Sequence, residues 1–374
     1  MSYSFKGFAR NDGTVGIRNY IGVVSSVVCS SVITKEIADK VPAAIPITHT
    51  NGCAQLGDDF QLTKNTLLGV SANPNLHSTL FIGLGCETNQ VSGLLESAIK
   101  TKPIEGIGIQ QLAGGRNTVT KGKTIVEEWA KEVEEEKRVE VPLSFLTVGI
   151  LAIDIDEESL TKVTPVIGSV VDTLVDHKAT VIVGMSKSLE PAGTLLSKRA
   201  ISEKLQQRLQ EAGEGLKRRR WKEITNISSG CDEFSPSEKS YATVEAHLTG
   251  SKPIYNWLGY TEQPNQKGLH LLTVPSNLVE ALSNMAASGC NMVMIVSNRG
   301  LLASSIALPC MMITPQNSHV PFDELTDYTI SENMNVNHVE KVLDMMIDIC
   351  SGKQTSLEKF GLGEFAIPHI GTTF

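Results

Sequence analysis

The 374-residue sequence lacks the features that mark several large classes of protein. It has no uninterrupted apolar run of the roughly 18–20 residues that a membrane span needs. Arg10, Asp12 and Arg18 interrupt the first 20 residues, where a secretory signal would be apolar. The seven cysteines are odd in number and include no Cys-x-x-Cys pair, which does not suit a secreted disulfide framework. We therefore expect a cytoplasmic protein that does not associate with membranes.

Several catalytic and binding signatures are also absent. The sequence has no Gly-x-Ser-x-Gly elbow and no phosphate-binding P-loop, which argues against a serine hydrolase and an NTPase. Lys and Arg number 33 against 41 Asp and Glu, and the resulting net charge of -8 disfavours nucleic-acid binding. What is present is an ordinary globular composition, with 41% hydrophobic and 5% aromatic residues.

Apolar runs alternate with amphipathic segments, which predicts an α/β fold with mainly parallel sheets. We expect strands over residues 20–28, 44–49, 79–84 and 106–110, with helices over 30–40, 58–70 and 90–100 between them. A long helix over 117–140 has a charged end followed by Pro142, which we interpret as a boundary between two α/β domains, residues 1–140 and 141–374. The second domain has further expected strands near residues 143–152, 180–184, 268–274 and 291–296.

A glycine-rich segment with two arginines, residues 7–19, precedes the first expected strand. Two guanidinium groups can hold a carboxylate in bidentate geometry, so we predict that Arg10, Asp12, Arg18 and Asn19 bind an anionic substrate. The alternative is a surface turn in which an arginine pairs with the aspartate. The glycines do not follow a strand, so this is not a dinucleotide-binding fingerprint.

Thiols and an imidazole fall at or just beyond the ends of three expected strands: Cys29, His49 with Cys53, and Cys86 followed by Glu87. In an open parallel sheet, ligands bind outside the carboxyl ends of the strands, so these groups should converge. Cys29, His49, Cys53 and Cys86 are therefore predicted to hold a metal, iron or zinc. An iron–sulfur cluster is a second interpretation, although the familiar close cysteine spacings are absent. Small buried cysteines and one hydrogen-bonded histidine are the third.

Two further segments follow expected strands of the second domain. Residues 154–158 include four carboxylates, among them Asp156, which would suit a hard cation or a general base, or simply an acidic helix start. Arg299, in the turn at residues 297–300, could bind a carboxylate. A plain turn is the alternative there.

Taken together, these motifs resemble the altronate and galactarate dehydratase family over nearly the whole chain. The resemblance rests on motifs in fixed order: residues 7–19 running into Cys29-Ser30, His49-Thr-Asn-Gly-Cys-Ala-Gln55, Asn73-Pro-Asn75, Gly83-Leu-Gly-Cys-Glu87, and a tail at 351–372.

The resemblance implies a lyase that removes water from a hydroxylated sugar acid to give a 2-keto-3-deoxy acid, with iron as the usual metal. The arginines would hold the acid, and Asp156 and Glu87 are the candidate catalytic carboxylates. Many family chains begin with a small all-β domain, whereas this chain starts at the Arg10 motif. A separate small β-domain subunit is therefore implied, and we also expect a homo-oligomer.

The chain departs from the family pattern mainly in its second domain. A family Cys-Gly-Gly-Ser-Asp corresponds to Ala152-Ile-Asp-Ile-Asp156, a Gly-Arg-Gly-Ser to Asn298-Arg-Gly-Leu301, and an Asp-x-Asp-x-Asn to Asp327-Tyr-Thr-Ile-Ser331. Three hypotheses follow. The chain is an active lyase on a small hydroxy acid, with sulfolactate sulfo-lyase, which eliminates sulfite, as the runner-up activity; or a non-catalytic relative that binds a small acid; or an enzyme of another elimination or isomerisation class.

Overall fold

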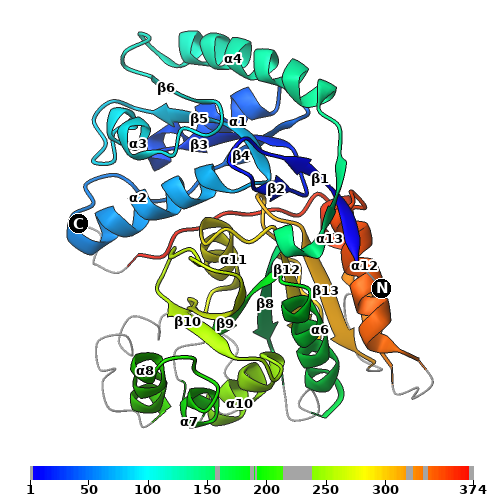
Figure 1. Cartoon of the computed structure of the whole chain (residues 1–374). Coiled ribbons are helices and arrows are strands. Elements are labelled where there is room, and N and C mark those ends of the chain that lie inside the picture. Colours follow the sequence, from blue (N-terminus) through cyan, green and yellow to red (C-terminus); the bar gives the residue numbers. More distant parts are fainter. Residues whose placement is uncertain are drawn as a thin grey trace.

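The computed structural model describes residues 3–155, 161–185, 189, 192–213, 238–316, 323–331 and 336–369. Two parallel sheets and one small antiparallel sheet organise these residues (Figure 1). The predicted α/β fold with mainly parallel sheets is thereby confirmed. None of the described helices is both long and apolar enough to cross a membrane. Asp156, a predicted catalytic residue, lies outside the described residues.

The first parallel sheet has the strand order β4-β3-β5-β6. Its strands are β3 (Tyr20–Ser25), β4 (Ala44–Ile47), β5 (Leu76–Gly83) and β6 (Ile104–Gly108), connected by α1 (Ser31–Ala38), α2 (Gly57–Ala72) and α3 (Val91–Ser97). The helix predicted over 117–140 is α4 (Gly115–Glu135); it ends earlier than predicted, and Val139–Pro142 form strand β7. All residues of β5 are buried, as expected for a central parallel strand covered on both faces. The chain turns to one side after β3 and to the other after β5, so these strands flank the topological switch point.

The second parallel sheet has the order β10-β11-β9-β8-β12-β13-β14. The strands are β8 (Thr147–Ile153), β9 (Thr180–Met185), β10 (Ile254–Leu258), β11 (Gly268–Thr273), β12 (Met292–Ser297), β13 (Cys310–Pro315) and β14 (Tyr328–Ile330). The helices are α6 (Thr164–Asp176), α7 (Ala192–Ser197), α8 (Glu203–Gly213), α10 (Glu238–Leu248), α11 (Leu278–Ala287), α12 (His338–Cys350) and α13 (Ser356–Lys359). The switch point here lies between β8 and β12.

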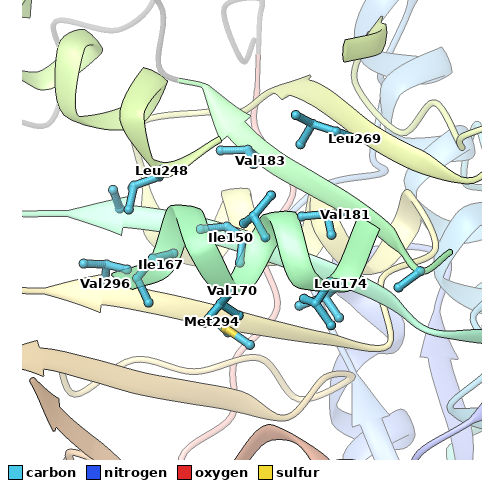
Figure 2. Packing of buried hydrophobic residues seen from close by; sticks show 14 of the residues in the cluster. Ile150, Ile167, Val170, Leu174, Val181, Val183, Leu248, Leu269, Met294 and Val296 are labelled. Atoms are coloured by element: carbon cyan, nitrogen blue, oxygen red, sulfur yellow. The ribbon is translucent and has the colours of Figure 1, made fainter. Parts of the chain in front are cut away.

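The core of the second sheet follows from the periods of strand and helix. Ile167, Val170 and Leu174 of α6 lie on one helix face and pack on the sheet beside Ile150 and Met294 (Figure 2). Alternate strand residues face the other layer, where Leu151 and Ile295 join a cluster with α2 and α11. The sheet is therefore covered on both faces, which leaves its strand ends as the places where polar loops gather.

The small sheet joins the N-terminal segment to the segment that follows α4. β1 (Ser4–Ala9) pairs antiparallel with β2 (Val15–Gly16) and with β7 (Val139–Pro142). Phe5, Val15 and Ile17 belong to the same hydrophobic cluster as α6 and α12. The N-terminal segment thus contributes to the core of the second sheet as well as leading into the first.

Candidate functional site

Three loops gather at the carboxyl edge of the first sheet, after β3 (residues 26–30), β4 (48–56) and β5 (84–90). We call them the thiol loops. They are bonded to one another: Val28 N donates to Asn51 O at 2.9 Å, and Ser26 Oγ donates to Glu87 Oε1 at 3.0 Å. The convergence predicted from strand ends is present at the level of the backbone.

Each thiol loop carries one exposed cysteine: Cys29, Cys53 and Cys86. Cys310 and Cys350, by contrast, are buried, and burial raises the pKa of their thiols to about 11 and about 12. The exposed thiols are therefore available to a metal or a reactant, while the buried ones behave as small core residues.

His49 is engaged by the backbone. Its Nε2–H donates to Ser25 O at 2.9 Å, and its Nδ1 accepts from Asn51 N at 3.1 Å. Burial lowers the pKa of His49 to about 4, against the opposing effect of the bond to Ser25, so the ring is neutral at pH 7. Both ring nitrogens are occupied, and the side chain ties the end of β4 to the end of β3.

The predicted metal set does not come together as a ligand group in this arrangement. Among the described residues, no three His, Cys, Asp or Glu side chains are grouped so that they could hold a metal ion. His49 has no free ring nitrogen, which leaves the three thiols as donors. These side chains do not form a ready-made ligand set, and a metal at these loops would be held by Cys29, Cys53 and Cys86 without His49.

Glu87 is buried between two of the thiol loops. Besides the bond from Ser26, its Oε2 accepts from Gly85 N at 2.5 Å. Both carboxylate oxygens thus join the ends of β3 and β5 at the switch point. This geometry suits a group that positions the Cys86 loop.

Gln55 was not among the predicted site residues. It lies in the loop after Cys53. The residue is 4% exposed, and neither atom of its amide has a hydrogen-bond partner within the described part of the chain. Buried amides are normally paired. The only sequence feature that pointed to Gln55 is its position at the end of the motif His49–Gln55.

The second switch point centres on Asp154, which directly follows β8. Its Oδ1 accepts from Ser297 Oγ at 2.8 Å and from Asn298 N at 2.9 Å, while Oδ2 is buried and accepts no hydrogen bond from the described residues. Burial raises the pKa of Asp154, and the bond from Ser297 and the charge of Arg299 oppose that shift. Arg299 is exposed beside it.

The backbone of Asp154 is left-handed, with φ of 46°. This region favours glycine, and glycine is the residue that the family resemblance places at this position. Asp154 therefore places a carboxyl group in a backbone conformation that glycine adopts without strain. The group of four carboxylates at residues 154–158, directly after an expected strand, was the sequence signal for it.

The C-terminal segment connects the two switch points. Glu364 N donates to Ser304 O at 2.9 Å, and Asn51 Nδ2 donates to Ile367 O at 3.1 Å. Four residues span at most about 14 Å when extended, so the segment after β12 lies close to the thiol loops. Figure 1 shows this red segment running between the two domains and ending beside α2.

The N-terminal motif lies at the other end of β3. Arg18 is buried and donates through Nε and Nη2 to Glu358 at 2.8 and 2.7 Å, and through its remaining N–H groups to backbone carbonyls. Arg10 donates to Pro74 O and pairs with Glu136 at 3.1 Å. These guanidinium groups hold the N-terminal segment in place, and the structure does not bring them to the thiol loops.

The two other residues of that motif also have local partners. Asp12 accepts from Thr14 and from Thr101 Oγ1, as in a capped surface turn. Asn19 Nδ2 donates to Val133 O at 3.5 Å. Of the predicted substrate-binding residues, only Arg299 lies at a carboxyl edge of a sheet.

The fold and these loops define a two-domain α/β protein with polar loops at both strand switch points, which are the places where open α/β sheets bind ligands. Residues 7–134 match the second domain of D-galactarate dehydratase/altronate hydrolase, and residues 143–373 match the C-terminal region of D-galactarate/altronate dehydratase. The chain therefore belongs to the D-galactarate/altronate dehydratase family, as predicted. This membership places it among the carbon–oxygen lyases of the sugar-acid dehydratase type.

Curated relatives align with nearly the whole chain. It is 26% identical to altronate dehydratase from Bacillus subtilis (strain 168) over 393 residues, covering 99% of this chain and 78% of that protein. The altronate dehydratase of Escherichia coli (strain K12) is 25% identical, covering 98% and 78%. The (2R)-sulfolactate sulfo-lyase subunit beta of Chromohalobacter salexigens is 23% identical, covering 98% and 97%.

Proposed function

We propose that this chain is a hydro-lyase that dehydrates a hydroxylated sugar acid, such as altronate or galactarate, to a 2-keto-3-deoxy acid. The observation that carries the proposal is alignment with altronate dehydratases over 98–99% of the chain. The connected loops at the two switch points support it, because they supply acidic, cationic and thiol groups where a small acid would bind.

The reaction needs a base and an acid. The base takes the proton from the carbon that bears the carboxylate, and the released electron pair forms a carbon–carbon double bond. The hydroxyl on the next carbon leaves as water after receiving a proton from the acid. The resulting enol takes up a proton at carbon 3 and loses its hydroxyl proton, which gives the keto acid.

We assign Arg299 to the substrate carboxylate and Asp154 to proton donation. Arg299 is exposed and charged, and a guanidinium suits a planar carboxylate. Asp154 has a raised pKa, and the two donors on Oδ1 leave Oδ2 as the oxygen that carries the proton. Glu87 positions the Cys86 loop in this scheme, and Asp156 stays the predicted base.

Iron at the exposed thiols also stays a prediction. Soft thiolate ligands suit iron, and Cys29, Cys53 and Cys86 are the accessible donors. Bound iron would supply Lewis-acid polarisation of the substrate's oxygens.

A separate small subunit is the proposed partner. This chain aligns with 97% of a relative that is itself named as a beta subunit. The same match favours a second candidate activity, the elimination of sulfite from (2R)-sulfolactate.

Product formation tests these candidates. The protein, purified without oxygen and supplied with ferrous iron, is incubated with altronate, galactarate or (2R)-sulfolactate, and 2-keto acid and sulfite are measured. We expect keto acid from a sugar acid and a loss of about 100-fold or more in kcat for Asp154→Asn. Asp39→Asn, an exposed change at the end of α1, is the matched control. Sulfite release would select the second activity, and the absence of any product would refute the lyase.

A further inference from the structure

A cleft of about 550 Å³ opens between the two domains on the side opposite the thiol loops. Its walls come from residues 12–14, 72–74 and 99–101 of the first domain and 144–147, 263–267 and 288–291 of the second. Thr147 begins β8, Thr180 begins β9, and Thr101 precedes β6. The cleft therefore lies at the amino ends of strands, so it is distinct from the loops to which we assign catalysis.

Lys267 supplies a positive charge at the second-domain wall of this interdomain cleft. Lys267 is exposed at the cleft and lies over the Phe145 ring at 5.4 Å, and it forms no ion pair with the described residues. Asp12 is the carboxylate among the lining residues that the structure describes, and both its oxygens already accept hydrogen bonds. An anion beside Lys267 would thus meet an available ammonium, whereas Asp12, on the first-domain wall, keeps its negative charge.

The wall formed by the turn at residues 73–76 is backed by a buried arginine and a buried lysine. Arg10 Nε donates to Pro74 O at 2.9 Å, and Lys102 Nζ donates to Leu76 O at 3.1 Å. Burial, followed by the charge of Arg10, lowers the pKa of Lys102 to about 7 against the effect of Asp12. Lys102 is therefore only partly protonated at pH 7, and the charge of Arg10 behind this wall is paired with that of Glu136.

The remaining lining suits a polyhydroxylated molecule. Thr101, Thr147 and Gln266 supply hydroxyl and amide groups, and the Ser288 hydroxyl is buried without a partner in the described structure. Phe145 and Ile99, which are 42% and 58% exposed, offer apolar surface to C–H groups. The volume lies within the range of about 300–1,000 Å³ found for small-molecule sites.

We propose that the interdomain cleft is a second ligand site that binds a small polyhydroxylated carboxylate, with Lys267 contacting the carboxylate. The choice of sugar acids as ligands rests on the proposed function. Because both domains form the walls, occupancy stabilises their relative arrangement, and through it the connected loops on the other side. The ligand is either the substrate or the keto-acid product of the reaction.

Methyl NMR can separate this site from the catalytic loops. Isoleucine δ1 methyl groups are labelled with ¹³C; Ile99 reports on the cleft, and Ile306, whose N–H donates to Glu364 O, reports on the C-terminal segment. Ile99→Val and Ile306→Val assign the two signals. Altronate, galactarate and the 2-keto-3-deoxy acid are titrated separately, so the ligand that moves the Ile99 signal identifies the source.

We expect the Ile99 signal to titrate with a Kd of about 1 mM and Lys267→Met to weaken binding about 10-fold or more. Lys123→Met, which removes an exposed lysine of α4, is the matched control and should leave the titration unchanged. An Ile99 signal that stays fixed at about 50 mM of every ligand, or that titrates equally in Lys267→Met, would overturn the proposal.

The two proposals fail separately. Ile99 titration in a protein that forms no product would leave the cleft site standing and refute the lyase. Product formation together with an Ile99 signal that does not move would support the lyase and refute the cleft site. Asp154→Asn should lose turnover and keep the Ile99 titration, because Asp154 follows β8 and the cleft lies at the start of that strand.

Discussion

Replacing Glu358 by Gln should destabilise the whole chain. Glu358 lies in α13, and its carboxylate accepts two hydrogen bonds from Arg18 at 2.7 and 2.8 Å and one from Tyr20. The Arg18 and Glu358 side chains are 8% and 14% exposed. The substitution keeps the shape but leaves the buried guanidinium without a counter-charge.

The expected loss follows from that burial. Removing one partner of a buried ion pair costs about 3–5 kcal/mol, whereas an exposed pair contributes about 0–1 kcal/mol. We take about 3 kcal/mol, because some exposure remains. For a domain of this size, that corresponds to a fall in Tm of about 6–12 °C.

The substitution should also change how stability depends on pH in the acidic range. Burial would raise the pKa of Glu358, but the hydrogen bonds and charge of Arg18 outweigh burial and lower it. The carboxylate therefore contributes stability above its unfolded pKa of about 4.3, and that stability is lost as pH falls through the lower folded pKa. In this range, the free energy of unfolding of Glu358→Gln should therefore vary less with pH than that of the wild type.

Urea unfolding followed by circular dichroism at pH 7 measures the difference. Glu127→Gln, which breaks the exposed ion pair with Lys123 on α4, is the matched control and should change stability by less than about 0.5 kcal/mol. If Glu358→Gln matched this control, the assignment of Arg18 to structure would be refuted. An Arg18→Lys variant with a raised KM and an unchanged Tm would favour the substrate-binding role predicted from sequence.

Two other outcomes follow from the thiol loops. Because burial lowers the pKa of His49 to about 4, the unfolded chain takes up this proton first as pH falls, so about 3 kcal/mol of stability present above pH 6.5 should be lost between pH 6.5 and 4. Urea unfolding across that range should show a weaker pH dependence in His49→Gln; an equal slope would contradict the assignment. Elemental analysis of anaerobically purified protein should find iron that is lost in Cys53→Ser and Cys86→Ser but kept in Cys290→Ala, a buried control. Iron-free protein after reconstitution would end the metal prediction.

Local sequence pattern predicted the sheets and the placing of the thiols. Continuous apolar runs such as β5 and the 3.6-residue period of α6 report burial directly, because burial depends on one element and its immediate layer. Cys29, Cys53 and Cys86 follow strands, and parallel topology alone carries residues that follow neighbouring strands to one edge.

The tertiary structure decided what the polar side chains do. The sequence shows that Arg18 carries a guanidinium group, but not which carboxylate it pairs with. Its partner Glu358 lies 340 residues away in the sequence, and Glu136, the partner of Arg10, lies 126 residues away. Long-range hydrogen bonds of this kind have no local period, so both arginines could be interpreted from the sequence as substrate ligands.

The same distinction applies to His49 and Asp154. The ring nitrogens of His49 are bonded within its own loop and to β3, and Asp154 gains its partners only because β12 lies beside β8. Family, fold class and the strand ends that carry chemistry were determined by the sequence, because they depend on the order of motifs and on periodicity. Packing between segments far apart in the chain decided which polar side chains have hydrogen-bond partners, which are buried and which are exposed. The same packing formed the cleft between the domains.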